Sequence, residues 1–278
     1  MGKGKEMGGT LSAGMEPVAS KAMDAKLREI WGKFEKGWMR RELRSVLPPT
    51  RIEWMGVKFI VYPRDNFTEF RMWELGRPPE HEATEEIAAM LAGSNAVIVD
   101  VGANAGAFGL PILARAGKTA RGLFFEPNPV MLQRLNANIG LNEIKNARVF
   151  DCAISDAPGR SAMFFPKNGN LGQGRVELSY AGTAEADETI EVEIKTLPDC
   201  LRSARVARVD FLKVDVEGLE DKVIVPLLDG DEKLWPGMIY FEVEHQGSWD
   251  LPLLGRLAEC GYDEVKSFGK NRLYRRAK

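Results

Sequence analysis

The segment VIVDVGANAGAFG, residues 97–109, constrains the fold more than any other part of the chain. Its first five residues are apolar apart from Asp100, which is the pattern of a buried strand. Gly102 and Gly106 then permit a tight turn and let a ligand approach the backbone closely. The apolar residues after them favour a helix. A strand, a glycine turn and a helix in this order place a ligand site beyond the carboxyl end of the strand.

Segments with strand and helix patterns alternate from residue 84 onward. Such alternation predicts an α/β fold, with a mostly parallel sheet and helices on both faces. The expected strands cover residues 97–101, 121–126, 147–152, 190–196, 209–215, 238–243 and 271–275. The expected helices cover residues 84–92, 107–116, 129–139, 218–228 and 249–260.

The chain before this region has a different organisation. Residues 1–19 are rich in glycine and poor in apolar residues, so we expect disorder there. Residues 20–77 form an expected extension, with one amphipathic helix over 20–46 and a short β-hairpin over 51–63. Residues 78–278 are the expected catalytic domain. Within it, the polar, Gly-rich segment 166–189 is expected to be a loop or flap at the rim of the sheet.

Composition excludes several classes of protein. The formal net charge is -2, which gives no general attraction to nucleic acid or to a membrane. No apolar run approaches the roughly 20 residues of a membrane span. Three well-separated cysteines without a C-x-x-C pair argue against disulfides and fit a reducing cytoplasm. We therefore expect a cytoplasmic protein without a nucleic-acid partner or transmembrane segment.

The apolar stripe of the N-terminal helix is expected to cover the site or to form a homodimer.

Glycine spacing discriminates between cofactors. The segment reads D-x-G-x-x-x-G, whereas a dinucleotide-binding turn requires G-x-G-x-x-G to hold a pyrophosphate. The next strand, GLFFEPNP, ends on Glu126, where an acid accepts hydrogen bonds from two ribose hydroxyls. The site therefore suits a ligand that has free ribose hydroxyls, no phosphate and a cationic group. S-adenosylmethionine has these features. A purely structural turn is the alternative interpretation.

These motifs resemble the FkbM family of S-adenosylmethionine-dependent methyltransferases. The resemblance covers about residues 78–265 and includes VIVDVGANAGAFG, FFEPNP and VDFLKVDVEGLE, although Gly109 stands where the family usually has Ser or Thr. It implies a Rossmann-like, seven-stranded sheet whose last strand is antiparallel. It also implies that S-adenosylmethionine contacts Glu80, Asp100, Gly102, Ala103, Asn104, Gly106, Phe108, Glu126, Pro127, Asp151, Cys152, Ala153 and Asp215. For Glu80, a carboxylate at the entry to a helix is an equally good interpretation.

The catalytic candidates follow the next two strands. Asp215 and Glu217 end one strand, and the other ends in the sequence Glu242-Val-Glu244-His245. We expect His245 to be the general base, because histidine titrates near neutral pH, with Asp215 and Glu217 beside it. A strand-end histidine with only a structural hydrogen bond is the alternative. The carboxylates and the histidine also suit magnesium or manganese, although the resemblance implies no required metal.

We therefore expect an O-methyltransferase that acts on a hydroxyl of a small molecule, such as a sugar or a secondary metabolite. Enzymes that methylate amino groups of nucleobases resemble one another in an Asn/Asp-Pro-Pro-aromatic turn after the fourth strand. Here that place has the sequence DVEG, which argues against methylation of a nucleobase. The alternatives are an N-methyltransferase, a metal-assisted methyltransferase and a non-catalytic module that only binds S-adenosylmethionine.

Overall fold

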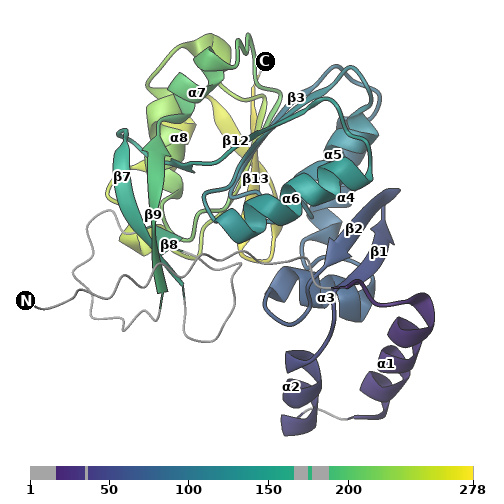
Figure 1. The fold of residues 1–278 in the computed structure, drawn as a ribbon. Helices are drawn as coiled ribbons and strands as arrows, with labels where there is room; N and C mark the ends of the chain where they lie inside the picture. The colour runs from purple at the N-terminus through teal and green to yellow at the C-terminus, as the bar shows by residue number, and fades with distance from the viewer. Residues whose placement is uncertain (1–16, 35–36, 166–174, 177–187, 278) are drawn as a thin grey trace, which may run out of the picture.

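A seven-stranded sheet runs through the computed structural model, which describes residues 17–34, 37–165, 175–176 and 188–277 (Figure 1). Its strands are, in spatial order, β12 (Tyr262–Phe268), β13 (Asn271–Arg276), β11 (Met238–Glu242), β10 (Phe211–Val214), β3 (Val97–Val101), β4 (Arg121–Phe125) and β5 (Ala147–Phe150). The strands from β11 to β5 are parallel, and β13 is antiparallel to both of its neighbours. The predicted α/β class and the antiparallel last strand are confirmed.

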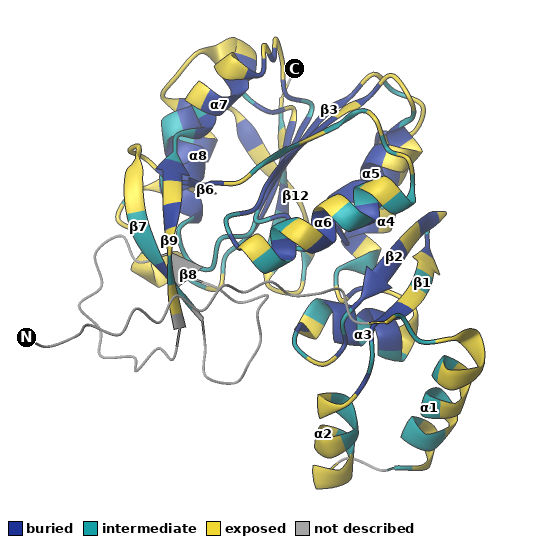
Figure 2. Cartoon of the chain, viewed as in Figure 1, coloured by how far each residue is buried: buried dark blue, intermediate teal, exposed yellow. Residues whose placement is uncertain are grey.

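Both faces of the sheet are covered, which explains why the central strands β3 and β10 are apolar apart from Asp100 and Lys213. Helices α4 (His81–Met90), α5 (Gly109–Ala116) and α6 (Pro129–Leu141) pack on one face. Helices α7 (Leu197–Ser203), α8 (Glu220–Leu228) and α9 (Leu253–Glu259) pack on the other. The strands are buried between helices whose outer surfaces are exposed (Figure 2). Each strand therefore contributes alternate residues to two separate hydrophobic cores.

The order of the strands reverses next to β3. From β3 the chain continues to β4 and β5 on one side, and later returns to β10 and β11 on the other side. Loops from β3 and β10 therefore diverge at the carboxyl edge of the sheet, and a crevice forms between them. This position is the one at which ligands bind in open α/β sheets.

The predicted hairpin is present as β1 (Thr50–Trp54) and β2 (Val57–Val61), and the helix α3 (Phe67–Leu75), which was not predicted, follows it. Phe59 and Trp73 are buried in the same core as Leu110 of α5. The hairpin and α3 thus extend one hydrophobic core of the main sheet. The predicted boundary between residues 77 and 78 stays a prediction.

The prediction of one helix over residues 20–46 is wrong, because two helices occupy this region. They are α1 (Lys21–Lys33) and α2 (Trp38–Ser45). Phe34 is extended, and Gly37 has φ +149°, a backbone conformation that favours glycine. The amphipathic stripe is real nevertheless, because Trp31 packs edge-on against the rings of Phe70 and Trp73.

The strand predicted over 190–196 is present as β9 (Glu188–Lys195), but it lies outside the main sheet. It joins β6 (Ala153–Ile154), β7 (Gly159–Phe165) and β8 (Arg175–Val176) in a four-stranded sheet. Val192 and Ile194 are buried while Glu191 and Glu193 are exposed, as in a sheet with one face in water. The unpredicted strand β12 takes the seventh place in the main sheet.

Two predictions fall mainly on residues outside the described ranges. Residues 1–16 of the predicted disordered segment are among them, and so is most of the predicted flap at 166–189. No helix in the described part of the chain is both long and apolar enough to cross a membrane.

Gly109, at the start of α5, gives a test of this packing. A Cβ added there would lie 2.4 Å from Asp100 Oδ2 and 2.6 Å from Phe124 Cε1, and both side chains are buried. We expect Gly109→Ala to lower the free energy of unfolding by about 1–3 kcal/mol through overpacking. Gly140→Ala is the control, because a Cβ at Gly140 in α6 would meet nothing within 4 Å. Urea denaturation measures both, and a Gly109→Ala variant as stable as the unsubstituted protein would contradict the packing argument.

Candidate functional site

Two adjoining pockets open at the carboxyl edge of the sheet, beside the reversal of strand order. The larger has about 770 Å³ of space including its open mouth, and the smaller has about 370 Å³. Gly102, Asn104 and Asp215 line both of them. The glycine turn after β3 and the end of β10 therefore separate two compartments that share one junction.

The glycine turn passes very close to the end of β10. Gly102 has φ +78°, and a Cβ on it would lie 1.9 Å from the carbonyl oxygen of Asp215. The backbone N–H groups of Gly102 and Ala103 both donate to the carbonyl oxygen of Phe125, at the end of β4. Only glycine fits at position 102, because any side chain there would collide with the backbone of β10.

Glu126 closes the other side of the turn. Its Oε2 accepts a hydrogen bond from the backbone N–H of Asn104 at 2.7 Å, and its Oε1 accepts one from Asn128 at 2.8 Å. Burial raises the pKa of Glu126 to about 7, and the two backbone N–H groups oppose this rise. A carboxylate offers about four acceptor positions. Glu126 lines the larger pocket and can therefore accept two further donors from a ligand.

Lys213 stands in the middle of β10, within an otherwise apolar strand. Its register partners are Asp100 on β3 and Tyr240 on β11, and all three belong to one row across the sheet. Lys213 Nζ donates to Gly102 O at 3.1 Å and to Asp215 Oδ2 at 3.2 Å, and it lies 3.5 Å from Asp100 Oδ1. Burial alone would lower the pKa of this amine, but the surrounding carboxylates raise it. Lys213 is therefore charged.

Glu80 adds a third carboxylate to this cluster. Its Oε1 accepts from Tyr240 Oη at 3.0 Å and from Asn271 Nδ2 at 3.4 Å. Burial raises the pKa of Glu80 to about 7, Lys213 opposes that rise and Asp215 adds to it. Glu80, Asp215 and Lys213 line the smaller pocket. Carboxylates outnumber the single amine, so this compartment suits a ligand with a positive charge.

The catalytic candidates lie at different distances from this junction. Asp215 lines both pockets, and Glu217, which has φ +57°, lines the larger one. His245 lines neither pocket, and its side chain lies next to Gly218 in the loop after β10. The structure thus brings Asp215 and Glu217 to the pockets and leaves His245 outside their lining.

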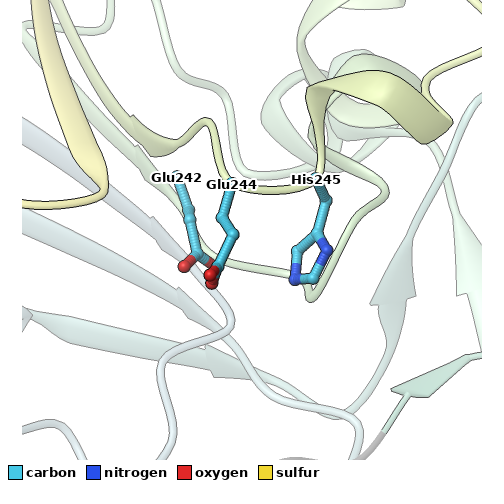
Figure 3. A group of neighbouring side chains, drawn as sticks. All are labelled: Glu242, Glu244 and His245. Atoms are coloured by element: carbon cyan, nitrogen blue, oxygen red, sulfur yellow. The ribbon is translucent and has the colours of Figure 1, made fainter.

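Glu242, Glu244 and His245 form a group whose ligand atoms all lie within 4.8 Å of one another (Figure 3). Strand alternation would separate Glu244 from His245, but β11 ends at Glu242 and the chain turns. Burial, together with the charges of Asp215 and other nearby carboxylates, raises the pKa of Glu242 to about 7. Two carboxylates and an imidazole can bind a divalent cation. Glu244 is exposed, however, and its ion pair with Lys270 competes with such an ion.

The other predicted cofactor residues divide into two groups. The larger pocket is lined by Pro127, Cys152 and Ala153, and the smaller one by Ala103 and Phe108. Neither pocket is lined by Asp100, Gly106 or Asp151. Their role as cofactor contacts stays a prediction.

Sequence reasoning did not identify Lys213 or Asn128 as parts of the site. A lysine within the apolar run FLKV was the available signal for Lys213, because a charge is buried only with partners. Asn128 caps α6 by accepting hydrogen bonds from Val130 and Met131, and the sequence EPNP carries that signal.

Comparison with known proteins decides the family. Residues 100–264, more than half of the chain, match the family described as the methyltransferase FkbM domain. The chain belongs to this family.

Three relatives show how far the similarity extends. Methyltransferase sdnD of Sordaria araneosa is 33% identical over 51% of this chain and 63% of its own length. The 31-O-demethyl-FK506 methyltransferase FkbM of Streptomyces tacrolimicus is 31% identical over 50% and 61%. The 2-O-methyltransferase NoeI of Sinorhizobium fredii is 31% identical over 60% and 72%. The chain thus spans less than two thirds of the first two relatives.

Glu242 gives a test of the charges at the rim. Because its pKa is about 7 in the folded protein and 4.5 in the reference state, the folded protein holds this proton more tightly. Its contribution to stability is therefore present below pH 4.5 and is lost as the pH rises through 7. We expect Glu242→Gln to melt at a higher temperature than the unsubstituted protein at pH 8, and the gap to close at pH 5. Exposed Glu53, changed to Gln, is the control. An equal difference in melting temperature at pH 5 and pH 8 would refute the raised pKa of Glu242.

Proposed function

We propose that this protein is an S-adenosylmethionine-dependent O-methyltransferase that acts on a hydroxyl group of a small molecule. The observation that carries the proposal is the pair of pockets joined at Gly102, Asn104 and Asp215. One pocket offers a carboxylate with free acceptor positions, and the other offers an excess of negative charge. The membership of the FkbM family supports the same reaction.

The residues fit the parts of S-adenosylmethionine. Glu126 would accept hydrogen bonds from the two ribose hydroxyls in the larger pocket. Met131 and Ile154 also line that pocket and would contact the adenine ring. In the smaller pocket, Glu80 and Asp215 would hold the ammonium group. When bound, this cofactor supplies an activated methyl group on a sulfonium. Cytoplasmic location, the lack of a nucleic-acid partner and a homodimer stay predictions beside this proposal.

The chain's own residues would orient the acceptor and remove its proton. Methyl transfer to a hydroxyl gains most from alignment, and a base adds about 10²–10⁴-fold. Asp215 and Glu217 stand at the pockets, while His245 stands in the next loop, beside Gly218. We assign the base to His245, with Asp215 and Glu217 positioning the acceptor.

The oxygen acceptor is supported by the relatives. The names of two of them, a 31-O-demethyl-FK506 methyltransferase and a 2-O-methyltransferase, specify methylation at oxygen. A metal-assisted reaction is the second candidate, and the grouping of Glu242, Glu244 and His245 favours it. Chelation with EDTA separates the two, because only the metal-assisted enzyme would stop and then recover with magnesium or manganese.

The activity itself is tested by incubating the protein with labelled S-adenosylmethionine and a metabolite extract. Mass analysis then identifies the compound that gains a methyl group, and its fragmentation shows whether oxygen or nitrogen carries it. Labelled cofactor that stays bound without any turnover would favour the non-catalytic alternative.

Glu126 gives the sharpest test of cofactor binding. Removal of two charge-assisted hydrogen bonds from a buried site should weaken binding by about 2–3 kcal/mol in Glu126→Ala. Ribose hydroxyls donate to the ionised carboxylate, and the pKa of Glu126 is about 7 in the free protein. The affinity of the unsubstituted protein should therefore rise from pH 6 to pH 8. Calorimetry measures both effects. Unchanged affinity in Glu126→Ala, or affinity independent of pH, would refute the ribose contact.

His245 gives the test of proton removal. We expect His245→Ala to lower kcat by about 10²-fold or more and to leave the affinity for S-adenosylmethionine nearly unchanged. Single-turnover kinetics and calorimetry measure these two quantities separately. Near-normal kcat with a lower melting temperature would show that His245 is structural, and the base would then be Asp215 or Glu217.

A further inference from the structure

Asn66, in the connection between β2 and α3, contacts the glycine turn at residues 102–106, which is the cofactor loop of the proposed function. Asn66 lies outside residues 100–264, which match the family. Its side chain is fully buried, and its Nδ2 lies 3.2 Å from Met131 Sδ. Two further hydrogen bonds give it two separate tasks. Asn66 Oδ1 accepts a hydrogen bond from the backbone N–H of Glu69 at 2.9 Å and so caps α3. Asn66 Nδ2 donates to Asn104 Oδ1 at 2.9 Å. A helix cap alone does not require the second bond.

Asn104 is the residue of the turn that most needs such support. Its φ is +51°, in the left-handed region that residues other than glycine adopt at a cost. Asn104 Oδ1 also accepts from the backbone N–H of Ala105 at 2.8 Å. The hydrogen bonds from Asn66 and Ala105 to Oδ1 hold the Asn104 side chain. The backbone N–H of Asn104 then points at Glu126 Oε2, 2.7 Å away. Asn66, Asn104 and Glu126 thus form a continuous chain of hydrogen bonds.

Asn66 is itself held rigidly. Glu69, in the first turn of α3, forms a buried ion pair with Arg134 of α6 at 2.5 Å. The guanidinium of Arg134 also pairs with Asp65, next to Asn66 in the chain, at 2.8 Å. Helix α6 begins directly after the Glu126 turn. The donor on Asn66 is therefore fixed relative to the same helix that follows Glu126.

We propose that Asn66 is a positioning residue for the cofactor: it sets the conformation of Asn104 and, through it, the direction of the Glu126 carboxylate. The proposal rests on the proposed function, because it assumes that Glu126 binds the ribose. It makes the segment between β2 and α3 a part of the cofactor site, although this segment precedes the residues that define the family.

The test separates the two tasks of Asn66. Asn66→Asp keeps an oxygen that caps α3 but replaces the donor by an acceptor facing Asn104. Asn142→Ala is the matched control, because Asn142 ties α6 to the backbone of Lys58 in the hairpin without contacting the cofactor loop. Calorimetry with S-adenosylhomocysteine gives the affinity, and thermal melting gives the stability. We expect Asn66→Asp to weaken the binding of S-adenosylhomocysteine about tenfold or more. The same variant should raise the KM for S-adenosylmethionine with little change in kcat, while Asn142→Ala lowers only the melting temperature.

A double-mutant cycle shows whether the effect passes through Asn104. Asn104→Gly keeps the positive φ and the backbone donor but removes the side chain. In that background Asn66→Asp should change the affinity less than about twofold, because the coupled group is gone. Asn66→Ser, which also keeps a capping oxygen, replaces Asn66→Asp if the aspartate variant does not fold.

The outcomes are distinct. Unchanged affinity in the folded Asn66 variant, Asn66→Asp or its replacement Asn66→Ser, overturns the inference. An effect of the same size with and without the Asn104 side chain overturns it as well. Failure of the unsubstituted protein to bind S-adenosylhomocysteine would instead refute the proposed function.

Discussion

The buried amine of Lys213 holds the site together. Lys213 and Asp100 are buried at this edge of the sheet, and Glu80 and Asp215 are partly buried beside them. An isolated charge in this place would lose hydration without compensation. Together they are tolerated, since Lys213 lies within 3.5 Å of both Asp100 and Asp215. The same amine donates to the carbonyl oxygen of Gly102 and so fixes the glycine turn against the end of β10. Sheet, turn and charge cluster therefore depend on one another.

This arrangement also decides which ligands the edge of the sheet admits. A dinucleotide-binding edge presents backbone N–H groups to a pyrophosphate. Here the first two N–H groups of the turn donate to Phe125, and that of Asn104 donates to Glu126. With its donors used and its carboxylates in excess, the edge repels phosphate and attracts a cation. The fold is shared with dinucleotide-binding proteins, but the electrostatic character is reversed.

The sequence predicts the parts of this structure that depend on local pattern. Continuous apolar runs identified the strands around β3, and the acid after β4 was placed correctly at the edge. The alternating strand β9 was assigned to the wrong sheet, because a strand pattern alone does not say which neighbours pair with it. Neither Lys213 nor Asn66 was predicted as part of the site, since both act through contacts between distant segments. The grouping of Glu242, Glu244 and His245 was predicted only as an alternative, a metal site, because it depends on where β11 ends. A charge within an apolar run is a local signal that Lys213 needs partners, but the sequence around it does not show that Asp100 and Gly102 are among them.

Two amide side chains hold the glycine turn, one from Asn66 before α3 and one from Asn138 on α6. Asn66 Nδ2 bonds the side chain of Asn104, while Asn138 Nδ2 donates to the carbonyl oxygen of Ala105 at 2.9 Å. Asn138 Oδ1 in turn accepts from the backbone N–H of Ile60 in the hairpin. A loop fixed by buried hydrogen bonds loses little conformational entropy when a ligand arrives, so more of the contact energy appears as affinity. Under the proposed function, the hairpin and α3 would contribute to cofactor binding by ordering the loop in advance.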